Sequence, residues 1–322
     1  MFINFLRSIA LVWRAFPKNS LLATVKYLAR SALHPWTSWR WHAEIGANPL
    51  LLQAARQQPR IFMKPLRPYL NKTFAPRARV AALASHYEFV ARRLGPSFLA
   101  AAAHGRGIAV ATLSASEGRR YSAHLASTDT FDREGEFVLS LQCDAARQRV
   151  ACVTFSIVNI GDAPRLHIGC LQGPPRASGK ALVKQATRDF HGMRPKNVLI
   201  DALYTLAGSW SIQRIVAVGN QQRIMGGGCD QVRADYDSFW QELGGKELPG
   251  EHYQLPAALH HRSLDEVPSQ RRSEYRRRQA LRQTLAAQIF ESLALASADV
   301  VRAPIADWER FDVPAWQPAL VS

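Results

Sequence analysis

The chain has 322 residues, 47% of them hydrophobic, and a formal net charge of +16 from 41 Lys and Arg against 25 Asp and Glu. This length allows one large domain or two ordinary ones, and the apolar fraction excludes a disordered or membrane-embedded chain. The positive charge favours an anionic partner such as acidic lipid, nucleic acid or a phosphorylated ligand, although it also serves solubility.

Four cysteines are present: Cys143, Cys152, Cys170 and Cys229. They form no CxxC pair and have no metal-ligand spacing, and the ten histidines are scattered, so the sequence predicts no metal site. Three of the cysteines lie in apolar runs typical of strands, where cysteine is a small buried hydrophobe. We therefore expect reduced thiols and a cytoplasmic protein.

The first 100 residues are predicted to form a helical N-terminal region. Residues 1–41 are apolar, aromatic and basic, and no acid precedes Glu44. The uninterrupted apolar run 8–13 is too short to span a bilayer. Two interpretations stay open: the segment lies on an anionic surface, peripheral at the inner membrane, or it forms two helices that pack on the main domain.

Further elements of this region follow from proline positions and periodicity. Pro35 is expected to close the first helical unit, and a short helix follows over residues 48–58. The prolines in residues 64–70 indicate an extended or turn segment. Apolar residues at three- and four-residue spacing predict an amphipathic helix over 76–94.

A core domain is predicted over residues 101–260. Five segments there have β-type patterning: 107–113, 121–127, 136–142, 150–158 and 166–171. Their short connectors predict an antiparallel meander.

The meander leads into a parallel crossover unit. Residues 165–173 form a strand, 174–180 a Gly/Pro loop, and two helical patterns separated at 191–195 precede a strand over 214–220. This order places the two strands side by side and parallel. The fold class is therefore α+β (mixed α/β), and we expect an open notch between the strand ends at Gly173 and Gly219.

The rest of the core and the C-terminus are mainly loop and helix. Residues 226–228 are three glycines, a lid or a plain linker, and 235–244 and 251–256 predict a short helix and a last strand. A basic C-terminal helix is predicted over 261–296, starting near Ser269, and 297–322 are predicted to be a tail.

The first turns of that helix carry a dense arginine cluster. We predict anion binding by Arg271, Arg272, Arg276 and Arg277, since guanidinium groups bind phosphate and carboxylate with two hydrogen bonds. The alternative is a solvated helix face. Nucleic acid is not the expected partner, because no nucleic-acid-binding motif accompanies the charge.

Several short motifs together resemble the VirK/YbjX-like family of bacterial proteins over about residues 20–295. They are HY at 86–87, IGCLQGP at 168–174, HGMRPKN at 191–197, YDSFW at 236–240, LP at 255–256 and VPSQRRSEYRRR at 267–278. The resemblance implies a bacterial protein associated with virulence and the cell envelope. It carries over no reaction and no catalytic residue.

The predicted layout is also similar to the acetyltransferase-like (acyl-CoA N-acyltransferase) fold. Such proteins bind the acyl-CoA pyrophosphate with Arg/Gln-x-x-Gly-x-Gly/Ala at a helix start, and residues 176–181 match this pattern. The second helix, over 197–208, departs from that layout. The resemblance implies acyl-CoA as cofactor, with its phosphates held by Arg176, Gly179, Lys180 and Ala181. Gln172, Gly173, Arg194 and Asn220 are further pocket candidates, because they lie at or beside the expected notch between the strand ends.

A transfer reaction would need a base for the attacking amine or hydroxyl and a donor for the leaving thiolate. His86, Tyr87, His191 and Tyr236 are candidates by residue type alone. Two classes of function remain open. The protein is an acyltransferase-like enzyme, or it is a non-catalytic factor whose basic helices dock on membrane or an acidic partner.

Overall fold

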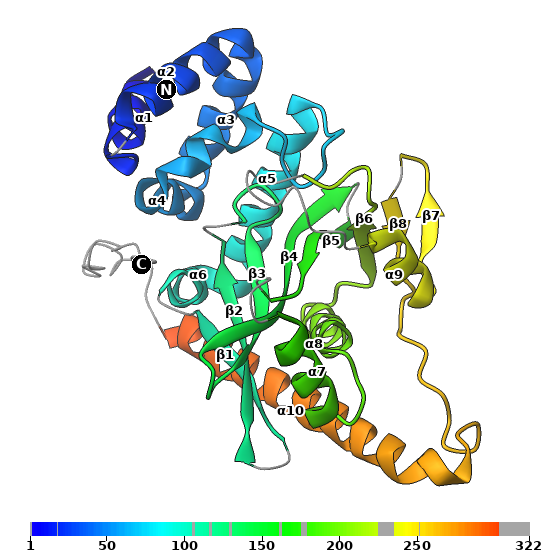
Figure 1. Cartoon of the computed structure of the whole chain (residues 1–322). Helices are drawn as coiled ribbons and strands as arrows, with labels where there is room; N and C mark the ends of the chain where they lie inside the picture. The colour runs from blue at the N-terminus through cyan, green and yellow to red at the C-terminus, as the bar shows by residue number, and fades with distance from the viewer. Residues whose placement is uncertain are drawn as a thin grey trace.

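A computed structural model describes residues 2–17, 19–104, 107–115, 118–128, 131–160, 163–174, 179–224, 235–250 and 252–302. N-terminal helices pack beside an eight-stranded sheet, and a long C-terminal helix runs along the sheet (Figure 1). Among the helices of these ranges, none combines the length and the apolar character that crossing a bilayer requires.

The sheet has the order β1-β2-β3-β4-β5-β6-β8-β7. Its strands are β1 (Ile108–Ser114), β2 (Arg120–Ser127), β3 (Phe137–Cys143), β4 (Gln148–Ile160), β5 (Ala163–Gln172), β6 (Arg214–Val218), β7 (Lys246–Leu248) and β8 (His252–Gln254). The first five strands form the predicted antiparallel meander, and β5 and β6 form the predicted parallel pair. The predicted mixed α+β class is confirmed, whereas β7 was not predicted.

Two helices fill the crossover between β5 and β6, as predicted: α7 (Gly179–Asp189) and α8 (Pro195–Ser209). The short helix α9 (Tyr236–Glu242) follows β6 and leads into β7. Between α8 and β6, Trp210 packs its ring against four aromatic rings at centroid distances of 6.1–6.4 Å, from Phe89, Phe98, Phe137 and Phe155. This cluster joins helices and sheet in one core.

The N-terminal region contains more helices than expected. They are α1 (Phe2–Ala15), α2 (Ser20–Leu33), α3 (Pro35–Ala47), α4 (Pro49–Gln57), the 3₁₀ helix η1 (Pro59–Leu66), α5 (Pro76–Phe89), the π turn η2 (Val90–Leu94) and α6 (Gly95–Ala103). Pro35 does not only end a helical unit; it also begins α3, because proline suits the first helical position. Residues 64–66, expected to be an extended or turn segment, lie in the 3₁₀ helix η1.

A buried ion pair ties this region to the sheet. The Lys64 Nζ donates to Glu136 Oε1 over 2.6 Å, and the two side chains are only 2% and 4% exposed. The Tyr87 hydroxyl donates to the other carboxylate oxygen of Glu136 over 2.7 Å. Every one of these groups would be costly to bury without its partners.

The C-terminal helix α10 (Arg272–Arg302) follows the short 3₁₀ turn η4 (Ser269–Arg271) and extends beyond its expected end at residue 296. It packs on α8, α6 and the edge strand β1 (Figure 1). Its side chains bond to the backbone of that strand: Thr112 N donates to Gln288 Oε1 over 2.6 Å, and Ser292 Oγ to Val110 O over 3.1 Å. The tail beyond residue 302 lies outside the described residues.

Candidate functional site

The parallel pairing of β5 and β6 stops before the two strands do. It runs from Arg165 opposite Arg214 to Ile168 opposite Ala217, although β5 continues to Gln172. On its other side β5 has a β-bulge: Phe155 of β4 pairs with Ile168, but Thr154 pairs with Cys170, which leaves Gly169 as the extra residue. A bulge bends its strand, so the bulge at Gly169 explains why β5 and β6 are no longer paired beyond Ile168 and Ala217. We call this unpaired end of the two strands the splay.

Gly169 is required at this position by close backbone packing. An ideal Cβ there would lie 2.0 Å from the carbonyl oxygen of Glu134, in the turn before β3. Any side chain would displace one of the two backbones. The bulge therefore also fixes Glu134 beside the splay.

The two strands lie side by side and parallel as predicted, but the predicted open notch between their ends is wrong. Two side chains of α9 occupy the splay: Leu171 N donates to the Tyr236 hydroxyl over 2.8 Å, and Trp240 Nε1 donates to Val218 O over 2.9 Å. Both rings are buried. They satisfy backbone groups of β5 and β6 that have lost their ladder partners, which is the physical reason for the filling.

Asn220, predicted to be a pocket residue, holds α9 in place. Its side chain donates to Asp235 and Asp237 over 2.8 and 2.9 Å, its N–H donates to Asp237 over 2.9 Å, and its Oδ1 accepts from Tyr236 N over 2.8 Å. These bonds clamp the N-terminus of α9 to the end of β6. Asn220 therefore positions Tyr236 through the backbone.

The two ionisable groups at the splay have shifted pKa values. Burial raises the pKa of Glu134 to about 7, with Arg133 opposing and Asp132 adding to the rise. Burial also raises the pKa of Tyr236 well above its ordinary value, and the nearby Cys170 and Glu134 add to that shift. No salt bridge to Glu134 is found in the described part of the chain. A carboxylate that titrates near neutral pH thus lies close to a phenol that stays protonated.

Two cysteines and one lysine complete the surroundings. The Tyr236 hydroxyl contacts Cys170 Sγ at 3.5 Å. Burial raises the pKa of Cys170, and it raises the pKa of Cys152 to about 11, so both thiols stay protonated. Burial lowers the pKa of Lys196, at the start of α8, whose Nζ lies 5.9 Å from the Phe239 ring centroid.

The predicted phosphate-binding segment is partly described. Gly173 follows β5, and an added Cβ there would meet no atom within 4 Å. The helix α7 begins at Gly179, so Lys180 and Ala181 lie in its exposed first turn, where free backbone N–H groups attract anions. Gln172, also predicted to line the pocket, is the last residue of β5. Arg176 lies outside the described residues, as do Cys229 and the three glycines at 226–228.

Both His191 and Arg194 lie between α7 and α8, and Arg194 is the residue that precedes α8. Arg194 pairs with Glu242 at the end of α9, which brings it to the side of the splay. His191 has a positive φ of 54°, and its carbonyl oxygen accepts a hydrogen bond from Arg278 of α10 over 2.5 Å. The structure gives His191 a role in the turn.

His86 and Tyr87 do not belong to the splay. His86 is fully buried, its Nδ1 accepts from Ile157 N of β4 over 3.2 Å, and burial lowers its pKa to about 3. Tyr87 is bonded to the Glu136 ion pair. A cavity of about 10 Å³, enough for roughly one water, touches both residues. Both side chains serve the packing of α5 on β4, and the structure brings neither to the other candidate residues.

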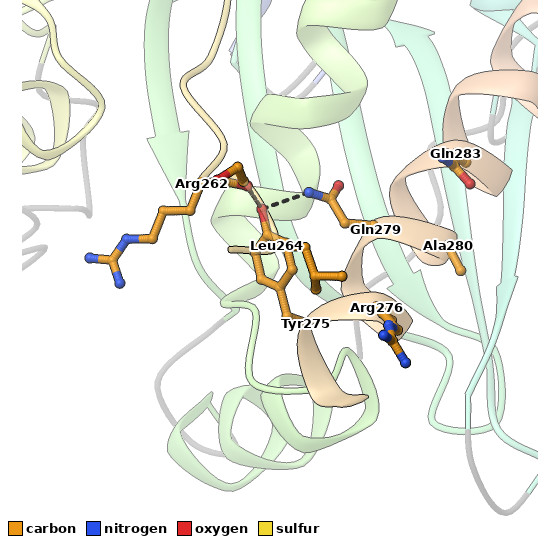
Figure 2. A pocket seen from close by; sticks show the side chains of 8 residues that line it. Arg262, Leu264, Tyr275, Arg276, Gln279, Ala280 and Gln283 are labelled. Atoms are coloured by element: carbon orange, nitrogen blue, oxygen red, sulfur yellow. Dashed lines mark hydrogen bonds between the residues drawn. The ribbon is translucent and has the colours of Figure 1, made fainter. Parts of the chain in front are cut away.

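The arginine cluster lies on η4 and the first turns of α10, away from the splay. Arg271, Arg276 and Arg277 are exposed, and Arg272 Nε donates to Val267 O over 3.0 Å. A cavity of about 360 Å³ lies between this helix and the segment before it (Figure 2). Arg262 and Arg276 line it, and Gln279 Nε2 donates to the Tyr275 hydroxyl over 2.7 Å. Anion binding by the cluster stays a prediction.

Two residues of the splay were missed by sequence reasoning. Glu134 lies in the turn between two predicted strands, and nothing in the sequence places that turn against a distant strand. Lys196 lies in the motif at 191–197 but has no distinguishing neighbour. The glycine inside the strand pattern at 169 was the one available signal for a bulge.

Known proteins similar to this chain extend the description. A family model described as "Protein of unknown function (DUF535)" matches residues 18–291. The chain is 27% identical over 258 residues to "Uncharacterized protein YbjX" of Escherichia coli (strain K12), covering 79% of this chain and 78% of that protein. It is 23% identical over 207 residues to "Membrane protein LapB" of Mannheimia haemolytica, covering 63% and 86%.

Solved structures give a weaker likeness. A variant of a "cAMP-binding acyltransferase from Mycobacterium smegmatis" matches with a TM-score of 0.29 and 12% identity, over 68% of this chain and 60% of that one. A TM-score and identity this low do not identify a shared activity.

Proposed function

The chain belongs to the DUF535 family, and for this member of it we propose an acyl-CoA-dependent acyltransferase whose site is the splay between β5 and β6. One observation carries the proposal: the bulge at Gly169 packs against the backbone of Glu134, whose carboxyl group has a pKa of about 7, and the protonated phenol of Tyr236 is bonded two residues further along the same strand. The anion-suited start of α7 follows that same strand end after the loop. The proposed acid, base and phosphate site thus all lie near one strand end.

The proposed reaction transfers an acyl group from a thioester to an amine or hydroxyl. Glu134 takes the proton of the nucleophile, which bonds to the thioester carbonyl carbon as the C–S bond breaks. Tyr236 donates its proton to the leaving thiolate. A pKa near neutrality suits Glu134 to be a base, and the raised pKa of Tyr236 keeps it a donor.

Entry of a thioester requires a rearrangement at the splay. The Leu171 N–H now donates to the Tyr236 hydroxyl. A thioester carbonyl that accepts from this N–H would free the hydroxyl to turn to the sulfur. The backbone of β5 would then stabilise the developing oxyanion.

Binding is tested first, by thermal shift of the full chain with acetyl-CoA, palmitoyl-CoA and free CoA. We expect stabilisation by CoA compounds and a loss of affinity of roughly fivefold for Lys180→Ala, since an exposed ammonium–phosphate pair contributes up to about 1 kcal/mol. Lys184→Ala, one turn later on the same exposed side of α7, is the matched control. No stabilisation by any CoA compound would remove the proposal.

Chemistry is tested by release of the CoA thiol in the presence of small amines. Tyr236→Phe and Glu134→Gln should each lower kcat about 100-fold or more, because each removes a proton-transfer group. Tyr204→Phe removes a hydroxyl of α8 that donates to Pro256 O, and it should leave the rate unchanged. Equal activity of all three variants would exclude the assigned roles.

A further inference from the structure

The helix α2 buries polar side chains and exposes large apolar ones. Its polar residues Thr24 and Ser31 are each only 7% exposed, and the Thr24 hydroxyl lacks a hydrogen-bond partner in the described structure. Its large aliphatic side chains point outward instead: Leu21 is 66% exposed, Leu22 52%, Val25 52%, Leu28 39% and Leu33 74%. We call these five residues the outward face of α2. A large apolar face on a protein surface marks a site of contact with a membrane or with another protein.

The neighbouring helices continue this character. α1 and α3 both pack against α2 (Figure 1). Half-exposed tryptophans lie on both of them, Trp13 on α1 and Trp36 and Trp39 on α3, and Leu6 on α1 is 50% exposed. Tryptophan is enriched where a protein meets the interface between water and lipid.

The charge of the same helices is positive apart from Glu44 in α3, which pairs with Arg40 over 2.7 Å. Arg7, Arg14 and Lys26 are exposed, and residues 2–43 contain no acidic residue. Lys26 directly follows Val25 and lies at the edge of the outward face of α2. Basic residues around an apolar helix face attract anionic lipid headgroups, at about 1 kcal/mol per residue.

We infer that α1–α3 dock this protein on an anionic bilayer. The outward face of α2 is inserted among the acyl chains, and the basic residues of α1 and α2 contact the headgroups. A second copy of the chain fits this surface poorly, because pairing two identical faces would bring like charges together. The inference concerns a surface apart from the splay and holds whether or not the protein is an acyltransferase.

The test is flotation of the full chain with phosphatidylcholine vesicles, with and without phosphatidylglycerol. We expect the protein to float with the anionic vesicles and its tryptophan emission to shift to the blue. The variant Leu21→Gln/Val25→Gln/Leu28→Gln changes only exposed residues to good helix formers, so it should fold. Its affinity for the vesicles should fall at least about tenfold.

Phe290→Gln/Leu295→Gln removes exposed apolar side chains from α10, and this variant should float like the parent. Flotation of the α2 variant at parental level, or no flotation of the parent, overturns the inference. A parent that does not float but is a dimer, with a monomeric α2 variant, would assign the face to a second copy instead.

Discussion

Three acids at alternate positions, Asp132, Glu134 and Glu136, end in three different environments. Asp132 pairs with Arg67 over 2.6 Å near the surface, and Glu136 pairs with Lys64 in the core. Glu134, between them, lies against β5 with its pKa raised to about 7. Spacing alone cannot assign these roles, because each depends on a strand or helix far away in the sequence.

The buried pair gives a prediction about stability. Lys64→Met would leave the Glu136 carboxylate with Tyr87 but without its cation, and we expect a loss of about 3–5 kcal/mol in the free energy of unfolding. Urea denaturation measures it. Arg92→Met, which breaks the exposed pair with Glu88, should cost less than about 0.5 kcal/mol. Comparable losses in the two variants would contradict the structural role given to Lys64.

At the scale of elements, the positions of most helices and strands were predictable from the sequence, but the faces that they turn outward or inward were not. The meander and the crossover followed from alternation, turn residues and connector length, and the structure confirms them. The N-terminal region was predicted to be helical, but the sequence analysis did not predict that the leucines of α2 face outward. Similarly, β5 was predicted as a strand, whereas its bulge depends on the backbone of Glu134 at Gly169.

The bulge can be tested by adding one carbon atom. Gly169→Ala places a Cβ 2.0 Å from the Glu134 carbonyl, so we expect a destabilisation of about 2 kcal/mol or more, measured by chemical denaturation. Gly208→Ala in α8 meets no atom within 4 Å and should stabilise by up to about 1 kcal/mol. If Gly169→Ala were as stable as the parent, the close packing of the two backbones would be refuted.

For the whole molecule, the response to pH follows from groups that are buried without charge. Burial lowers the pKa of His42 to about 4, and of His86 and His167 to about 3. Between these values and the ordinary 6.5, the unfolded chain binds protons that the folded chain does not, so stability falls as pH falls. Glu134 acts in the opposite direction, because its folded pKa is raised: the folded chain keeps that proton up to about pH 7.

We therefore expect the free energy of unfolding to decrease by about 2 kcal/mol from pH ~6.5 to ~5.5. The three histidines account for a loss of about 3 kcal/mol and Glu134 for a gain of about 1 kcal/mol. Urea denaturation at the two pH values measures it, and Glu134→Gln should show the full loss. A stability that is flat or rises on acidification would mean that these histidines are protonated in the folded protein.

The hydrogen bonds between α10 and β1 protect one edge of the sheet from pairing with another molecule. Val110 and Thr112 lie on the first strand of the sheet, where unused backbone groups would accept a strand from another molecule. Gln288 and Ser292 occupy those groups, and β7 at the opposite border is only three residues long. A chain truncated before Gln288 would lose this protection. We would expect it to self-associate through the exposed edge strand β1 and to aggregate during refolding.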